Sequence, residues 1–133
     1  MPSLTKLEYL KREALSQVIL DYLKNKSESE GEKLLKPFFE EFKMKKEILE
    51  EDIKNFLHLY ELPNDLLLQW RKRVRLLIDP LAKEYFKWLP VEQKTNFAEK
   101  ILDVNYPLDY FLKDYPEFKE YINLEINTLT SPK

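Results

Sequence analysis

The chain has 133 residues, a formal net charge of -2 and no cysteine, which excludes disulfide bonds and allows one domain's worth of core. Its single glycine, Gly31, excludes the glycine-rich loops that cradle phosphates and the tight hairpins of β-sheets. With 35% charged residues and abundant Leu, Lys and Glu, the composition predicts an all-α protein. We expect one compact helical bundle of about five to seven helices over residues 1–133, with a frayed tail at 128–133.

The first predicted helix covers residues 5–25. Thr5 followed by Glu8 is typical of a capping box. Apolar residues then recur every three or four positions, at Leu7, Leu10, Ala14, Val18 and Tyr22. The polar stretch "NKSESEG", which ends at Gly31, predicts a loop. A short second helix is expected to begin near Pro37, because proline is tolerated in a first helical turn but disrupts a helix interior.

A third helix is predicted over 45–61, where an apolar stripe lies opposite a face rich in glutamate. "PND" at 63–65 then supplies a stop and a new cap for the helix that carries Trp70. The prolines at 80 and 90 predict further boundaries, with helices at about 80–88 and 90–104. Pro107 and Pro116 predict a short helical turn followed by a last helix over about 116–127.

The basic stretch "WRKRVR" at 70–75 is the main functional lead. On a helical wheel, Leu67, Trp70, Val74 and Leu77 fall together on the core face. Arg71, Lys72 and Arg75 fall on one flank and Arg73 on the far side, so these four are the predicted nucleic-acid-binding residues. A solvated helix face, or ion pairs to the acidic helix at 45–61, would need the same residues. Both alternatives stay open.

A dense aromatic series marks the last third of the chain. Tyr106, Tyr110 and Tyr115 are candidates for a protein interface, because aromatic residues are favoured there, although core packing is the other use of this spacing. The neighbouring acidic residues would repel a phosphate backbone, so these rings are not predicted to stack on bases.

No motif for catalysis or metal binding is present in the sequence. His58 is the only histidine, which excludes Cys/His zinc sites, and the residue three positions before it is Asn55, so the Glu-x-x-His pattern of carboxylate-bridged bundles is missing. No serine lies in a nucleophile motif. We therefore expect no enzyme activity, no cofactor, no metal and no small-molecule substrate.

Charged residues interrupt every apolar run, so neither a secretory signal nor a membrane span is expected. Together with the absence of cysteine, this predicts a cytoplasmic protein.

A helical chain of this length, near neutral and with a basic ridge around "WRKRVR", resembles the small subunit of CRISPR Cascade-type effector complexes. The resemblance covers the whole chain in length and helix content. It implies a stacked bundle subunit without catalytic activity that contacts neighbouring subunits. It also implies that exposed cations, here Arg71, Lys72 and Arg75, hold a nucleic-acid strand.

The leading hypothesis is therefore a non-enzymatic helical subunit of a larger, ribonucleoprotein assembly, whose partners are other protein subunits and single-stranded nucleic acid. The rival hypothesis is a protein-binding adaptor or chaperone-like bundle that does not contact nucleic acid. The salt dependence of the binding affinity distinguishes the two hypotheses. Binding driven by phosphate contacts weakens steeply as the salt concentration rises, whereas binding through an apolar protein interface does not.

Overall fold

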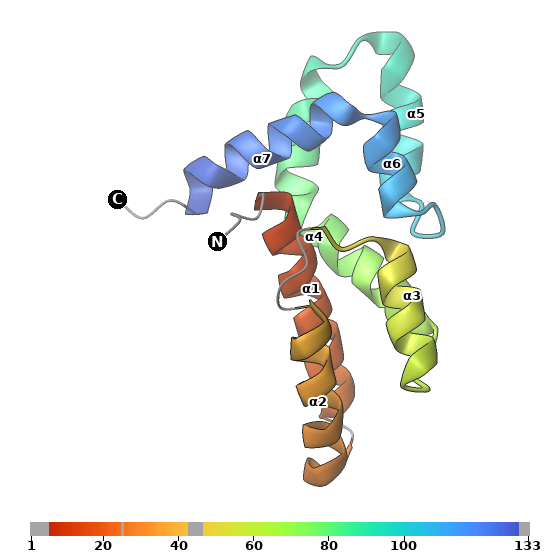
Figure 1. Cartoon of the computed structure of the whole chain (residues 1–133). Helices are drawn as coiled ribbons and strands as arrows, with labels where there is room; N and C mark the ends of the chain where they lie inside the picture. The colour runs from red at the N-terminus through yellow and green to blue at the C-terminus, as the bar shows by residue number, and fades with distance from the viewer. Residues whose placement is uncertain (1–5, 25, 43–46, 131–133) are drawn as a thin grey trace.

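The computed structural model describes residues 6–24, 26–42 and 47–130. Within these ranges the chain is all-α and contains no strand, as the composition predicts (Figure 1). The helices are α1 (Lys6–Leu23), α2 (Glu28–Phe42), α3 (Glu50–Leu59), α4 (Asp65–Trp88), α5 (Val91–Leu102), α6 (Leu108–Asp114) and α7 (Pro116–Thr130).

The long helix α4 organises the core, because α1, α3, α5 and α7 all pack against it. Trp70 of α4 belongs to this core and has none of its surface exposed. Its indole N–H donates to the Lys11 carbonyl oxygen at 3.0 Å. The predicted burial of Trp70, Leu67 and Val74 is confirmed. The same prediction is wrong for Leu77, which is 36% exposed.

The reason for the exposure of Leu77 is that the buried face of α4 is rotated away from it, toward the flank that carries Arg71 and Arg75, which are also buried.

A second cluster, made of aromatic rings, joins α5, α6 and α7 to the end of α4. Phe97 of α5 lies at its centre and is buried. Its ring meets that of Phe118 at 5.3 Å in an edge-to-face arrangement and that of Tyr85 at 5.6 Å. Such pairs stabilise the fold beyond the area that they bury. The dense aromatic series of the last third of the chain is therefore mainly core.

Two predicted helix boundaries at prolines are wrong. α2 begins at Glu28 and continues through Pro37, and α4 continues through Pro80. A proline inside a helix leaves the carbonyl four residues earlier without its N–H partner. Those carbonyls belong to Lys33 and Leu76, both of which are exposed residues.

The "NKSESEG" loop is also wrong, since the helix begins inside it. The Glu30 N–H donates to the Ser27 hydroxyl oxygen at 3.4 Å, and the Gly31 N–H donates to the Ser27 carbonyl at 2.9 Å. Ser27 followed by Glu30 is itself a capping-box pattern, so the sequence did contain the signal.

Other ends differ by a few residues. α3 begins at Glu50 rather than at 45, and residues 43–46 lie outside the described part of the chain. α7 continues to Thr130, so residues 128–130 of the predicted tail are helical, and 131–133 lie outside the described residues. Thr5 of the predicted first capping box is likewise not described.

Candidate functional site

Arg71 lies inside the molecule and does not belong to an exposed ridge. Its residue is 9% exposed, and its guanidinium grips the Glu50 carboxylate through two hydrogen bonds, Nε to Oε1 at 2.7 Å and Nη2 to Oε2 at 2.9 Å. Its Nη1 donates to the Val104 carbonyl oxygen at 3.0 Å. An ion pair to the acidic third helix, the alternative from the sequence, is therefore confirmed for Arg71.

Arg75 is 7% exposed and is also turned inward. Its two terminal nitrogens donate to backbone carbonyls of the α5–α6 connection, to Asp103 at 2.7 Å and to Tyr106 at 2.6 Å. Burial lowers the pKa of Arg75, and the positive charge of Arg71 lowers it further. Both arginines therefore shape the 103–107 connection, and the prediction that they form an exposed cationic ridge is wrong.

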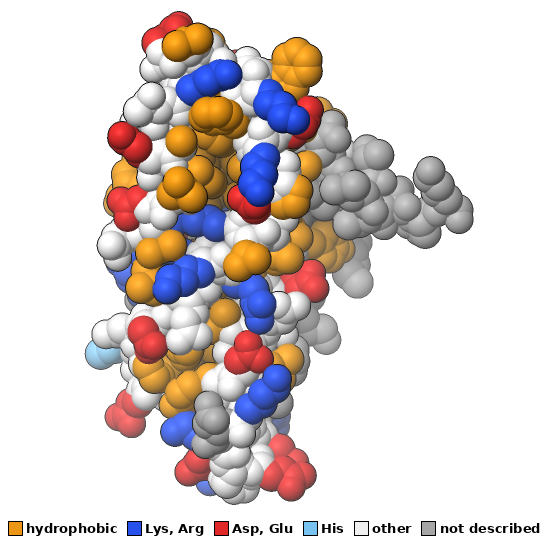
Figure 2. All heavy atoms as spheres, turned by 180° about the vertical axis from the view of Figure 1, so that it is seen from behind, with side chains coloured by type: hydrophobic (Ala, Val, Ile, Leu, Met, Phe, Trp, Pro, Cys, Tyr) orange, Lys and Arg blue, Asp and Glu red, His pale blue; other side chains and the backbone are white. Residues whose placement is uncertain are grey.

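Lys72 and Arg73 remain on the outside of α4. Lys72 is exposed, while Arg73 donates to an oxygen of Asp21 on α1 at 3.2 Å. Figure 2 shows the back of the molecule with Lys and Arg side chains scattered among acidic and apolar ones. That face carries no large area of a single charge. Of the four predicted nucleic-acid contacts, Lys72 and Arg73 alone can meet a partner.

A buried charge cluster continues from the arginine side toward α1. Lys11 is 1% exposed and donates from Nζ to the Glu8 carboxylate at 3.2 Å and to the Ile48 carbonyl at 3.1 Å. The second Glu8 oxygen accepts from the Ile48 N–H at 2.9 Å. The two side chains thus satisfy both backbone groups of Ile48 and fix the 47–49 segment against α1.

Asp109 of α6 completes this cluster. One carboxylate oxygen accepts from the Glu50 N–H at 2.7 Å, and the other lies 3.6 Å from the Lys11 ammonium with no hydrogen-bond partner. Burial raises the pKa of Asp109, while the Glu50 N–H and the Lys11 charge lower it. A Glu50 oxygen also accepts from the Leu108 N–H at 2.9 Å. The cluster holds α1, α3 and α6 together, and its Lys11 and Asp109 also line a hollow of about 480 Å³.

Tyr115, a predicted interface residue, belongs to the core. It is 9% exposed, and its ring packs against Phe97 and Phe111, each at a centroid distance of 5.1 Å. Its hydroxyl oxygen accepts from the Asn96 amide at 2.9 Å. The core use of this aromatic spacing is correct here, and the interface prediction is wrong.

Tyr106 and Tyr110 lie nearer to solvent. The Tyr106 hydroxyl donates to Asp114 at 2.5 Å, and Lys100 reaches the same carboxylate at 3.0 Å. These hydrogen bonds lower the pKa of Asp114 and raise the pKa values of Tyr106 and Lys100. The Tyr106 hydroxyl is therefore already hydrogen-bonded within the chain. Tyr110, which is 61% exposed, keeps the predicted capacity for a protein contact.

The most exposed apolar side chains were not singled out from the sequence. Trp88 and Val91 flank the turn between α4 and α5 and are 79% and 81% exposed. The sequence did contain a signal for this exposure, because Trp88 stands two residues before Pro90, at the end of a helix. Other highly exposed apolar side chains of the described residues include Leu59, Leu76, Leu102 and Leu124.

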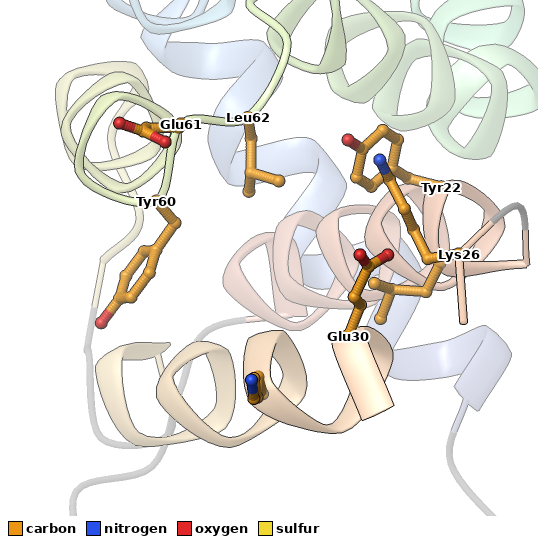
Figure 3. Close-up of a pocket in the computed structure, with 8 residues that line it drawn as sticks. Tyr22, Lys26, Glu30, Tyr60, Glu61 and Leu62 are labelled. Atoms are coloured by element: carbon orange, nitrogen blue, oxygen red, sulfur yellow. The ribbon is translucent and has the colours of Figure 1, made fainter. Parts of the chain in front are cut away.

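A hollow of about 420 Å³ lies where α1, α2 and the α3–α4 turn meet. Figure 3 shows Tyr60 and Leu62 on one side of it and Tyr22, Lys26 and Glu30 on the other. The Lys26 ammonium lies 5.0 Å from the centroid of the Tyr22 ring, and a hydrogen bond with Tyr22 raises the pKa of Lys26. Charges of both signs line this hollow, so it favours no single class of ligand.

Glu61, beside this hollow, has a left-handed backbone with φ of 55°. The Leu62 N–H donates to the Leu57 carbonyl at 2.8 Å and the Glu61 N–H to the His58 carbonyl at 3.2 Å. This is the Schellman arrangement that ends many helices, and glycine usually occupies the left-handed position.

Within the part of the chain that the structure describes, no three His, Asp or Glu side chains come together as a metal site, and no helix is long and apolar enough to cross a membrane.

Comparison with protein families, with characterised proteins and with solved structures finds no match to this chain.

Proposed function

We propose that this chain is a non-enzymatic helical subunit that binds a neighbouring protein in a larger assembly. The observation that carries the proposal is the exposure of Trp88 and Val91 at the turn between α4 and α5. Large apolar side chains that gather at a surface are typical of binding sites, and tryptophan is enriched among the residues that dominate binding energy.

The position of this turn favours docking. The Arg75 contact with the Asp103 carbonyl, at 2.7 Å, ties the end of α5 to the middle of α4, so the two helices run back alongside each other. Trp88 and Val91 then stand at the free end of this helical hairpin, at the opposite end of the molecule from α2 (Figure 1). A partner can cover them without disturbing the core around Trp70.

The test is recovery of a partner from the native source. Wild-type chain is compared with Trp88→Ser/Val91→Ser and with Leu59→Ser, which alters another highly exposed apolar residue, on α3. We expect the double variant to lose the bound protein and the Leu59 variant to keep it. Equal recovery by all three chains would refute this docking site.

A second candidate function is contact with a nucleic-acid strand, as the resemblance to effector subunits implies. Lys72, Lys83 and Lys87 support it, because their spacings along α4 are close to whole helical turns and their residues are exposed. Lys83 and Lys87 also pair with carboxylates on α4, each at 3.2 Å, which weakens their pull on phosphates.

This contact is tested by measuring how the affinity of the assembled complex for single-stranded nucleic acid depends on salt concentration. Replacing Lys72, Lys83 and Lys87 by Gln should reduce the slope of log affinity against log salt by about 0.7 for each single-strand phosphate that is no longer neutralised. An unchanged slope would leave protein binding as the function.

A further inference from the structure

A second hollow, of about 450 Å³, lies between the end of α3 and the start of α4. Its lining residues are Lys54, Asn55, Leu57, His58, Asn64 and Leu67. None of the six is acidic, and the four polar ones can all donate hydrogen bonds. The hollow in Figure 3 is different, because Glu30 and Glu61 line it together with two lysines.

The backbone brings these donors together. Lys54 and His58 are one turn apart on α3 and therefore share a face. The Schellman turn then reverses the chain and places Asn64 at the N-cap of α4. Asn64 also stands at the N-terminus of α4, which is the positive end of the helix dipole. Leu57 and Leu67, both buried, form the apolar base of the hollow, while Lys54, His58 and Asn64 are exposed.

The four polar side chains are not used elsewhere in the described structure. None of them takes part in a hydrogen bond or ion pair with another described residue, and the Asn64 amide does not cap its own helix. This contrasts with Arg71, whose guanidinium is fully occupied by Glu50 and a backbone carbonyl. His58, the single pale-blue side chain at the edge of Figure 2, faces solvent.

We propose that Lys54, His58 and Asn64 bind a phosphate monoester group. An ammonium, an imidazole N–H and an amide N–H supply donors from two helices, and a phosphate monoester carries two charges and three acceptor oxygens. A phosphodiester is a poorer fit, because it carries one charge and must leave the hollow on two sides. This site is independent of the apolar turn at Trp88 and Val91.

Nearby acidic residues limit the affinity. Asp65 follows Asn64, although its carboxylate is turned along α4, where it accepts from the Gln69 amide at 3.1 Å. Glu61 lies at the end of α3. We expect inorganic phosphate alone to bind the intact chain with a dissociation constant of about 1 mM, and a larger phosphate ester to bind more tightly through the apolar base of the hollow.

The experiment is a titration of the full chain with inorganic phosphate, followed by backbone amide chemical shifts at constant ionic strength set with sodium chloride. Saturable shifts are expected for the amides of residues 54–58 and 64–66. Lys54→Gln should weaken binding about 10-fold or more, because a charge-assisted hydrogen bond is lost. Lys36→Gln, an exposed lysine on α2 outside this hollow, should bind as the wild type does.

Asn64→Asp separates binding from folding. Aspartate is as good an N-cap as asparagine, so the thermal midpoint should not fall. The added negative charge should weaken phosphate binding about 10-fold or more. Linear, non-saturating shifts, or equal affinity in the Lys36, Lys54 and Asn64 variants, would overturn the proposal.

Three further probes then identify which kind of molecule supplies the phosphate group. Glycerol phosphate and a phosphoserine peptide both carry the monoester, and tighter binding of one identifies a small ester or a phosphorylated partner as the source. A dinucleotide carries only the diester. If it binds as tightly as the monoesters, the assignment of the site to monoesters is wrong.

Discussion

Trp70 and Trp88 lie on the same helix, five turns apart at 3.6 residues per turn, and an ideal α4 would point both toward the same face. Trp70 has no exposed surface, and Trp88 is 79% exposed. The first half of α4 is enclosed by α1, α3 and the 103–107 connection, whereas beyond Pro80 the helix runs toward the free end of the α4–α5 hairpin. Periodicity therefore identifies a helix face, but the neighbouring elements decide how far along that face the core extends.

The largest expected effect tests this comparison directly. Trp70→Ala should reduce the free energy of unfolding by about 3 to 5 kcal/mol, because it leaves a cavity and removes the hydrogen bond to Lys11. Trp88→Ala should change it by no more than about 0.5 kcal/mol. Denaturant unfolding of both variants gives the two values. Similar losses would mean that both ends of α4 are equally enclosed.

The neighbouring cations Arg71 and Lys72 give the next comparison. Arg71→Gln breaks a buried bidentate ion pair and leaves Glu50 without its partner, which should cost about 3 kcal/mol. Lys72→Gln, one residue away on the exposed side, should change stability by no more than about 0.5 kcal/mol. Denaturant unfolding again gives both values. Small and equal losses for the two variants would contradict the burial of Arg71 and would support the exposed cationic ridge instead.

A smaller effect, of opposite sign, is expected at the turn that leads into the enclosed half of α4. Glu61→Gly should raise the free energy of unfolding by about 1 kcal/mol, because glycine adopts the left-handed conformation without the steric cost of a side chain. Glu61→Ala keeps that cost and serves as the control. A loss of stability in the glycine variant would show that the glutamate side chain itself holds the turn.

The smallest effect concerns two aspartates of α6: Asp109, which contacts α1 and α3, and Asp114, which is exposed. Burial raises the pKa of Asp109 above its ordinary 3.8, so the folded state binds this proton more tightly than the unfolded state. The stability that Asp109 contributes is present below pH 3.8 and is lost as pH rises through the folded pKa. Relative to the wild type, Asp109→Asn should therefore become more stable as pH rises from about 3.5 to about 7.

Asp114 should behave in the opposite way. Hydrogen bonds from Tyr106 and Lys100 lower its pKa, so its contribution is present above pH 3.8 and is lost as pH falls through the folded pKa. Asp114→Asn should lose stability relative to the wild type as pH rises over the same range. Thermal unfolding of both variants across this range compares the signs, and parallel trends would contradict the burial of Asp109.

The helices were predictable mainly where local chemistry decides. Apolar periodicity placed α1 and α4, and the prolines at 90, 107 and 116 marked true starts, since a proline in a first turn breaks no hydrogen bond. Pro37 and Pro80 looked the same in the sequence but lie inside helices. Proline position alone therefore does not distinguish a helix start from a helix interior.

The candidate site was harder to predict, because a helical wheel gives the direction of a side chain but not what lies there. Arg71 and Lys72 appear on one flank, yet the Glu50 carboxylate from α3 captures the first and solvent surrounds the second. The donors around His58 were also not predicted, because they converge only once the turn at Glu61 brings the start of α4 back to α3.

The meeting of α1 with α7 has a consequence for how the chain folds during synthesis. The Leu7 N–H donates to the Asn123 side-chain oxygen across a separation of 116 residues, and α1 packs against both α4 and α7. At about 5 to 20 residues per second, a ribosome needs roughly 6 to 23 seconds to travel that distance. During that interval α7 is not yet available to pack against α1. Chaperone binding to the nascent chain should therefore be strongest early and end only when α7 emerges.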